Sequence, residues 1–323
     1  MKKNFDAFQN STDAQRTYRE IMLLQELNGH ENIIRLLNVI KAENDKDIYL
    51  IFEFMETDLH TVIRANILQP IHKQFIMYQI FKALKFIHSA GIIHRDLKPS
   101  NILINSDAYV KICDFGLARC INSTSNKDVT MTDYVATRWY RAPEILLGST
   151  KYTTQADMWS VGCIFGELLC GKPMFPGTST LNQINKVLEV TGKPTKDDIQ
   201  AVQSDLASTM LDTINVSKIK SLKSLFPKAD SIELDLLSKL LQFNPNKRMT
   251  VEEALEHPYV ADFHEQYKET EISCEKTIKI PIDDNVKYTV KEYRQKLYDD
   301  ILRRKKEIRK KLIEMQKKMT TKK

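Results

Sequence analysis

The sequence contains no uninterrupted apolar run of the length that a membrane span requires. Such a span needs about 18 consecutive apolar residues, and the richest stretch, WSVGCIFGELLCG at residues 159–171, already contains Glu167. The first residues, MKKNFDAFQN, also lack the apolar segment that follows the basic residues of a secretory signal. We therefore expect no transmembrane segment and no secretory leader, and we interpret residues 159–171 as a buried core helix.

Cysteine and glycine are both scarce. The five cysteines lie at positions 113, 120, 163, 170 and 274 and show no paired short spacing of the metal-binding or redox kind. An odd number of cysteines without a secretory segment indicates a reducing compartment, so we expect a cytoplasmic or nuclear protein. None of the nine glycines precedes Gly29.

In most of the chain, positive and negative charges nearly balance. The formal net charge is +6, but residues 292–323 alone contain 13 Lys or Arg and only 5 Asp or Glu. The rest of the chain is close to neutral, which argues against a nucleic-acid-binding body. Hydrophobic residues make up 42% of the chain and charged residues 28%, values that are ordinary for a globular protein with an ample core.

Local patterns predict an α+β protein. Residues 13–27 carry apolar side chains at helical spacing, and residues 33–40 and 47–54 flank a polar turn in a strand–turn–strand pattern. Residues 72–91 predict another helix, which ends on Gly91. Three residues are candidate N-caps of the first helix: Ser11, Thr12 and Asp13.

The succession of these patterns divides the chain into unequal parts. A small part that contains strands is followed by a longer part in which helical patterns dominate, and a basic segment ends the chain. The expected units are a small lobe with its connecting hinge at 1–57, a large lobe at 58–260, a C-terminal extension that packs on them at 261–291, and a basic helical tail at 292–323.

The residues with the clearest chemistry lie in HRDLKPSN at 94–101, on a predicted loop after a helix. Asp-Phe-Gly follows at 114–116 and Ala-Pro-Glu at 142–144. Any one of these motifs is weak support on its own, and His-Arg-Asp alone would be read as a solvated loop with a local salt bridge. Together, their order and spacing match the set that is typical of a protein kinase.

Phosphoryl transfer requires that the substrate be positioned and that the phosphate charge be neutralised, more than it requires covalent chemistry by the protein. These residue types can meet both requirements. Asp96 would orient the substrate hydroxyl and accept its proton, and Lys98 would stabilise charge on the transferring phosphoryl group. Asn101 and Asp114 offer the hard oxygen ligands that suit Mg²⁺. The sequence therefore predicts catalytic roles for Asp96 and Lys98 and a metal-binding role for Asn101 and Asp114.

Two longer stretches, TDYVATRWYRAPE at 132–144 and FDAFQNSTDAQRTYREI at 5–21, resemble the mitogen-activated protein kinase family. Within it, the chain is most similar to the atypical extracellular-signal-regulated kinases that activate themselves, over about residues 1–299. The resemblance implies a bilobal protein-kinase fold, with a truncated β-rich small lobe and a mainly helical large lobe. It also implies ATP and Mg²⁺ as cofactors, and transfer to Ser or Thr followed by proline in protein substrates.

The resemblance also implies sites of regulation. Thr132 and Tyr134 match the paired activation phosphosites in the form Thr-Asp-Tyr, modified by an upstream kinase or by autophosphorylation. Thr137 matches a threonine that braces Asp96 and Lys98. Five arginines match phosphate-binding positions, although each alone would be read as solvated charge: Arg19, Arg95 and Arg119 for phosphothreonine, and Arg138 and Arg141 for phosphotyrosine. Two structural ties are expected as well, from Glu144 to Arg248 and from Asp157 to the backbone of residues 94–101.

Around the nucleotide, the resemblance places Phe52 at the gatekeeper position and the backbones of Glu53 and Met55 at the adenine. Asp58 would reach the ribose, and Leu103 would lie beneath the base. For Phe52 and Leu103, plain core packing explains the apolar side chain nearly as well.

Cys113, directly before Asp-Phe-Gly, has two open interpretations: a thiol that faces the nucleotide, or an inert buried thiol.

Lys2 and Glu20 fall on the family's phosphate-binding lysine and its helix partner. The two strands that precede this lysine in the family, and their Gly-rich loop, have no counterpart in the sequence. We interpret this as a fragment or incomplete gene model, with an engineered truncation or a naturally shortened protein as alternatives. We expect a frayed edge strand and a poorly placed Lys2, so a non-catalytic kinase-like scaffold remains the alternative to an active kinase.

The C-terminal region offers two candidate interaction surfaces. Residues 301–319 predict a basic amphipathic helix that either contacts an acidic partner, an anionic membrane surface or nucleic acid, or packs on the kinase body. Its apolar stripe comprises Ile301, Ile308, Leu312, Met315 and Met319. An acidic docking patch like that of the family would use Asp262, Glu265, Glu269 and Glu271, with Lys268 among them.

Overall fold

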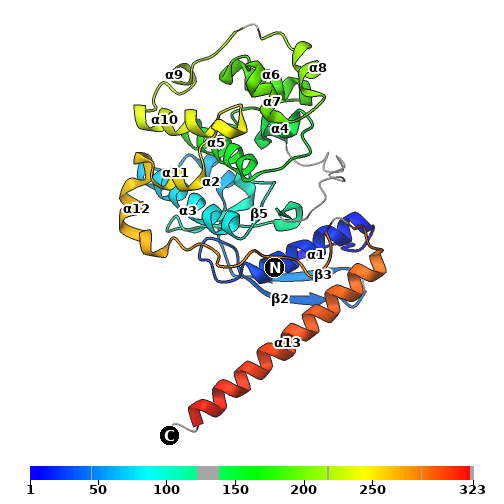
Figure 1. Cartoon of the computed structure of the whole chain (residues 1–323). Helices are drawn as coiled ribbons and strands as arrows, with labels where there is room; N and C mark the ends of the chain where they lie inside the picture. The colour runs from blue at the N-terminus through cyan, green and yellow to red at the C-terminus, as the bar shows by residue number, and fades with distance from the viewer. Residues whose placement is uncertain (45, 122–137, 217, 285, 321–323) are drawn as a thin grey trace.

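The chain folds into a small lobe and a larger, mainly helical lobe, with one long helix at the C-terminal end (Figure 1). The small lobe, formed by the N-terminal part of the chain, combines a three-stranded sheet with helix α1 (Ser11–Glu26). The predicted α+β, bilobal fold class is therefore confirmed. The computed structural model describes the whole chain except residues 45, 122–137, 217, 285 and 321–323.

The sheet of the small lobe has the strand order β1-β3-β2, with antiparallel neighbours. β1 (Lys2–Asn4) and β2 (Leu36–Lys41) flank the central β3 (Ile48–Phe52). Ile48 and Leu50 are both buried, so one face of β3 lies against the core of the lobe. Lys2 pairs with Leu50 across the first two strands. The expected fraying of the first strand is not observed, because β3 pairs with all three of its residues.

Helix α1 begins two residues earlier than the apolar spacing predicts. Its N-cap is Asn10, whose side-chain oxygen accepts hydrogen bonds from the backbone N–H groups of Thr12 and Asp13, each at 2.9 Å. Ser11, Thr12 and Asp13, the expected caps, lie within the first turn of the helix. Asn10 takes the cap because its extended backbone, with φ −144°, turns its side chain towards those N–H groups.

The large lobe is built around two long helices, α3 (Pro70–Ser89) and α5 (Thr154–Cys170), both rich in buried residues. The predicted core helix at 159–171 corresponds to α5. Gly171 follows it with φ +75° and Gly91 follows the end of α3 with φ +73°, the left-handed conformation that glycine adopts at helix C-termini. The other helices of this lobe are α2 (Leu59–Ala65), α4 (Pro143–Leu146), α6 (Thr180–Thr191), α7 (Lys196–Val202), α8 (Ala207–Asp212), α9 (Leu222–Leu225), α10 (Ser231–Leu240), α11 (Val251–Leu255) and α12 (Ala261–Tyr267).

Two small sheets position the loops that carry the sequence motifs. One has the order β4-β6-β7, and the other pairs β5 with β8, all antiparallel. Because β5 precedes residues 94–101 and β7 precedes residues 113–118, these sheets bring the two motif-bearing segments together. The strands are β4 (Thr57–Asp58), β5 (Ile92–Ile93), β6 (Ile102–Ile104), β7 (Val110–Ile112) and β8 (Arg119–Cys120).

Helix α13 (Val290–Thr320) completes the core of the small lobe with its first turns. Tyr293, Leu297 and Ile301 recur every four residues and are buried against α1 and the sheet. The expected boundary between extension and tail, at 291/292, thus falls inside one continuous helix. Arg304 still pairs with Glu26 of α1, and the C-terminal part of the helix extends away from the body (Figure 1). The side chains of Ile308, Leu312, Met315 and Met319, the rest of the expected stripe, lie outside the described residues. None of the described helices is both long and apolar enough to traverse a lipid bilayer.

Replacing Leu297 with alanine tests whether α13 belongs to the small-lobe core. Leu297 is 0% exposed, whereas the nearby Leu302 is 56% exposed. We expect Leu297→Ala to lower the free energy of unfolding by about 2–5 kcal/mol, because it leaves a cavity. The matched control Leu302→Ala should change it by less than about 0.5 kcal/mol. Urea unfolding of both variants measures this, and equal effects would contradict the assignment.

Candidate active site

The catalytic loop (residues 94–101) is fixed to α5 by one buried carboxylate. Asp157 accepts hydrogen bonds from the backbone N–H groups of His94 and Arg95, both at 2.9 Å. Its Oδ2 also lies 3.0 Å from His88 Nε2. Burial alone would raise the pKa of Asp157, but His88 and the N–H donors outweigh it and hold the pKa below its ordinary value. The tie predicted for Asp157 is confirmed.

Within this loop the three motif side chains converge. Lys98 Nζ donates to Asp96 Oδ2 at 2.8 Å. Asn101 Nδ2 donates to the Asp96 carbonyl at 2.8 Å and to its Oδ2 at 3.1 Å. The short helix η1 (Pro99–Asn101) closes the loop and places Asn101 within reach of Asp96. The six-residue spacing therefore brings all three groups to one point.

The second motif, the DFG turn (residues 114–116), lies against this loop. Cys113 N–H donates to the Asn101 carbonyl at 3.0 Å, and Phe115 packs edge-on against the His94 ring. Asp114 has a left-handed backbone, with φ +63°, which is uncommon for a residue other than glycine. Such strain is often found at functional sites.

Asp96 and Asp114 face a common space between the lobes. Both line a cleft of about 520 Å³ that Glu20 of α1 also lines. Asn101 joins them through its hydrogen bonds to Asp96. The residues expected to transfer the phosphoryl group and to bind Mg²⁺ therefore lie close to one another.

Lys2 enters the site from β1 and pairs with Glu20. Its Nζ lies 2.8 Å from Glu20 Oε1 and 3.1 Å from Oε2. Burial lowers the pKa of Lys2, but the negative charges of Glu20 and Asp114 outweigh this effect and raise it above its ordinary value. The partnership predicted from the family resemblance is present, and the lysine is held in place rather than frayed.

The donor groups fit a magnesium ion that keeps part of its water shell. Mg²⁺ is commonly held by one or two carboxylates together with substrate phosphates and water. Asp114 can supply a carboxylate, and Asn101 can supply an amide oxygen. Among the described residues, no cluster of three or more His, Cys, Asp or Glu side chains is arranged to hold a metal ion.

The residues expected around the adenine lie at the edge of the main core. Phe52, Met55, Leu103 and Cys113 are partly buried and pack against it. The hinge is further fixed by Glu53, whose N–H donates to the Arg35 carbonyl at 3.1 Å. The predicted adenine contact of Glu53 would therefore use its carbonyl oxygen.

Two hinge carboxylates have structural roles that sequence reasoning missed. Asp58 Oδ1 caps α2 by accepting a hydrogen bond from Thr61 N–H at 2.9 Å. Glu53 Oε1 accepts from Arg35 N–H at 2.8 Å and lies 3.1 Å from Lys111 Nζ. The sequence signal for Asp58 was visible as an Asp directly before a helical stretch. A ribose contact through Asp58 stays a prediction.

The expected structural pair and the expected docking patch have different outcomes. Arg248 and Glu144 form a buried bidentate ion pair, with N–O distances of 2.9 and 3.0 Å, so this prediction is confirmed.

In the docking patch, Asp262, Glu265 and Glu269 are exposed. Glu271 is not available to a partner, because it is buried and its Oε1 lies 2.7 Å from His264 Nδ1.

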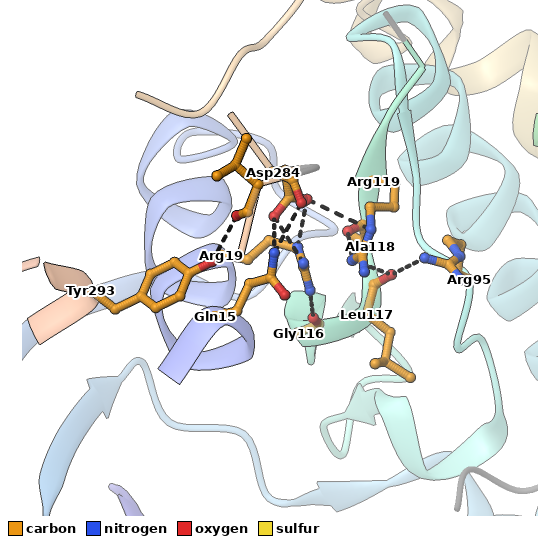
Figure 2. Close-up of polar contacts among 10 residues, drawn as sticks. Gln15, Arg19, Arg95, Gly116, Leu117, Ala118, Arg119, Asp284 and Tyr293 are labelled. Atoms are coloured by element: carbon orange, nitrogen blue, oxygen red, sulfur yellow. Dashed lines mark hydrogen bonds and ion pairs between the residues drawn. The ribbon is translucent and has the colours of Figure 1, made fainter. Parts of the chain in front are cut away.

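The arginines expected to bind phosphate are engaged with the protein itself. Arg19 and Arg119 both meet Asp284 of the C-terminal extension, while Arg95 approaches the Leu117 carbonyl at 3.4 Å (Figure 2). Arg138 Nη1 donates to the Thr178 carbonyl at 3.0 Å. Arg141 lines a small pocket beside Asp96. The activation-segment residues Thr132, Tyr134 and Thr137 lie outside the described residues.

The chain is similar in sequence to known protein kinases. Residues 1–260 match the protein kinase domain family. The chain is 61% identical over 314 residues to "Extracellular signal-regulated kinase 2" of Dictyostelium discoideum, covering 96% of this chain and 85% of the relative. It is 56% identical over 314 residues to "Mitogen-activated protein kinase 15" of Xenopus laevis, covering 96% of this chain and 53% of the relative. The chain therefore spans about half the length of the second relative.

Removing the charge of Asp157 should loosen the catalytic loop. Asp157→Asn keeps the shape but turns one acceptor into a donor, so we expect a loss of about 2–3 kcal/mol in the free energy of unfolding. Because the folded pKa is lowered, the stabilisation is present above the unfolded pKa and lost as pH falls through the folded value. The loss should therefore be present at both pH 7 and pH 5 in urea unfolding, because both values lie above the unfolded pKa of an aspartate. The exposed Asp107→Asn is the control, and an equal loss there would contradict the role.

The reactivity of Cys113 decides between its two interpretations. Burial, with a further contribution from Asp114, raises the pKa of this thiol to about 12. Only about 1 in 10,000 molecules would carry the thiolate at pH 8. We expect its alkylation by iodoacetamide, followed by peptide mass spectrometry, to be far slower than that of free cysteine and to rise through pH 9 without a plateau. A plateau near pH 8 would instead favour the thiol that faces the nucleotide.

Proposed function

Because the chain belongs to the protein kinase family, and within it to the mitogen-activated protein kinases, we propose that it phosphorylates Ser or Thr followed by proline in protein substrates, with ATP as donor. The observation that carries the proposal is the single cleft lined by Glu20, Asp96 and Asp114. These groups reach it from α1, from the catalytic loop and from the DFG turn. A scaffold that only binds partners has no need for this convergence.

Each residue has a role that follows from its contacts. Asp96, held by Lys98 and Asn101, orients the substrate hydroxyl and takes its proton. Lys98, already beside Asp96, neutralises charge that builds up on the transferring group. Lys2, fixed by Glu20, would hold the phosphates of ATP. Asn101 and Asp114 would hold Mg²⁺, which neutralises the phosphate charge when bound.

The proposal also covers how the enzyme is regulated and where in the cell it acts. Phosphorylation of Thr132 and Tyr134 in the Thr-Asp-Tyr motif, by an upstream kinase or by the chain itself, would activate the enzyme. Thr137 would brace Asp96 and Lys98. The basic tail would contact an acidic partner or an anionic membrane surface, since it carries most of the excess positive charge. We place the protein in the cytoplasm or the nucleus, as the cysteine pattern suggests.

Replacing Asp96 with asparagine tests the proposed reaction. With radiolabelled ATP, Mg²⁺ and a peptide that contains Ser-Pro, we expect Asp96→Asn to lower transfer by about 100-fold or more, because the hydroxyl loses its base. The exposed Asp107→Asn serves as a matched control and should retain the activity of the unmodified chain.

Two comparisons complete this experiment. Replacing proline by alanine after the acceptor serine should reduce transfer strongly if the enzyme is proline-directed. If the unmodified chain transfers no more phosphate than Asp96→Asn, the catalytic proposal fails and the scaffold interpretation takes its place.

A further inference from the structure

A carboxylate from the C-terminal extension occupies a site built from arginine and glutamine donors. Asp284 Oδ2 accepts a hydrogen bond from Arg19 Nε, and Oδ1 accepts one from Arg19 Nη2, both at 2.8 Å. Gln15 Nε2 lies 3.3 Å from Oδ1 and also donates to the Asp284 carbonyl at 2.9 Å. Arg119 Nε lies 3.6 Å from Oδ2 (Figure 2). Two guanidinium groups and one amide therefore surround this carboxylate.

A third arginine lies beside this site. Arg119 Nη1 donates to the Ala118 carbonyl at 2.9 Å and approaches the Leu117 carbonyl at 3.4 Å. Arg95 Nη1 approaches the same Leu117 carbonyl at 3.4 Å (Figure 2). Arg19, Arg95 and Arg119 thus form one arginine cluster, with members from α1, the catalytic loop and β8. Positive charges gathered in this way create a potential that attracts anions.

The donors of the arginine cluster suit a phosphate monoester as well as a carboxylate. The planar guanidinium fork binds both groups in the same bidentate way. A phosphate monoester carries a charge of about −1.5 to −2 at pH 7 and three acceptor oxygens, whereas a carboxylate has one charge and two oxygens. The arginine cluster can therefore form more charge-assisted hydrogen bonds with a phosphate than with Asp284.

Arg19 cannot bind a phosphate while it binds Asp284. Each of its three nitrogens already has an acceptor, because Nε and Nη2 bind Asp284 and Nη1 donates to the Gly116 carbonyl at 2.6 Å. The Arg19 side chain is 1% exposed and that of Asp284 is 8% exposed, so both groups are shielded from water. A phosphate that reaches Nε and Nη2 of Arg19 must therefore displace the carboxylate.

The segment that carries the carboxylate is suited to local release. Residues 281–284 and 286–289 form neither helix nor strand, and Ile282 is only partly buried against the core of the small lobe. Irregular segments with few buried contacts open locally at a low free energy. Tyr293 and Leu297 of α13 are fully buried. The helix can therefore stay in place when the segment before it is released.

We propose that the arginine cluster is a phosphate-binding site that Asp284 occupies as an internal ligand. A phosphate monoester, the phosphothreonine of Thr132, takes its place and releases the segment before α13. The inference deepens the proposed regulation of the kinase and rests on it for the source of the phosphate. Before phosphorylation, Asp284 supplies the counter-charge that the buried Arg19 needs. After phosphorylation, the same donors hold the phosphate.

Asp284→Ala removes the internal ligand and is the first test, with inorganic phosphate as the probe. The variant should lower Tm, because the buried Arg19 loses its counter-charge. About 50 mM phosphate should then raise the Tm of Asp284→Ala by about 2 °C over chloride of equal ionic strength. The unmodified chain should gain less than about 0.5 °C, because Asp284 already fills the site.

Two further variants complete this test. Glu275→Ala removes an exposed carboxylate of the same extension and reports phosphate that binds elsewhere, such as at the basic tail. Asp284→Asn keeps the volume of the side chain and should respond like Asp284→Ala, because a neutral amide competes weakly for guanidinium groups. If neither variant at Asp284 gains more Tm from phosphate than Glu275→Ala gains, the proposal is wrong.

The source of the phosphate is tested with phosphothreonine incorporated at Thr132 during translation. Amide hydrogen exchange of residues 280–284 should become at least about fivefold faster than in the unphosphorylated chain, because the phosphate displaces Asp284. In Asp284→Ala, the same phosphothreonine should abolish the gain from inorganic phosphate, since the site is then filled. Unchanged exchange, together with a persistent gain, would overturn the displacement of Asp284 by Thr132.

The outcomes also separate this inference from the proposed function, because neither experiment needs kinase activity. If the unmodified chain transfers no more phosphate than Asp96→Asn, the kinase proposal fails. The Tm and exchange measurements then still decide whether phosphate competes with Asp284. Conversely, an active kinase in which phosphate changes neither quantity would keep the proposed function and overturn this inference.

Discussion

Two consecutive buried charges on one helix organise the functional half of this molecule. Arg19 and Glu20 are adjacent on α1, and both side chains are shielded from water. Each needs an opposite charge, because an unpaired buried ion is strongly unfavourable. Glu20 obtains it from Lys2 on β1, and Arg19 obtains it from Asp284, far along the chain. The charge balance of one helical turn therefore brings the first strand and the C-terminal extension to the same helix.

Apolar packing also stabilises the contacts of α1 with the first strand and the C-terminal extension. A sheet of three strands and one helix has little interior of its own, and small units bury too little surface to be stable alone. The first turns of α13 supply the missing side chains, with Tyr293 and Leu297 fully buried among residues of α1 and the sheet. The segment that delivers the Asp284 charge is thus also part of the small-lobe core. Structural support and charge compensation come from the same region.

The sequence predicted those features that depend on short spacing. The catalytic loop, with Asp96, Lys98 and Asn101 within six positions, converges because one tight turn fixes all three. The Asp157 tie and the Glu144–Arg248 pair were recovered only because a family resemblance supplied them. Asp284 was missed, since no local pattern connects it with an arginine 265 residues away.

The sequence predictions that were wrong at other positions also have local causes. Asn10 was passed over as a cap because three other good cap residues follow it directly, and backbone geometry rather than residue type decided between them. Glu271 was grouped with exposed acidic neighbours, but the fold turns it inward towards His264. The fraying expected of Lys2 assumed a strand without support. Pairing with β3 and a buried Glu20 hold it instead, so the lysine's position depends on both the sheet and α1.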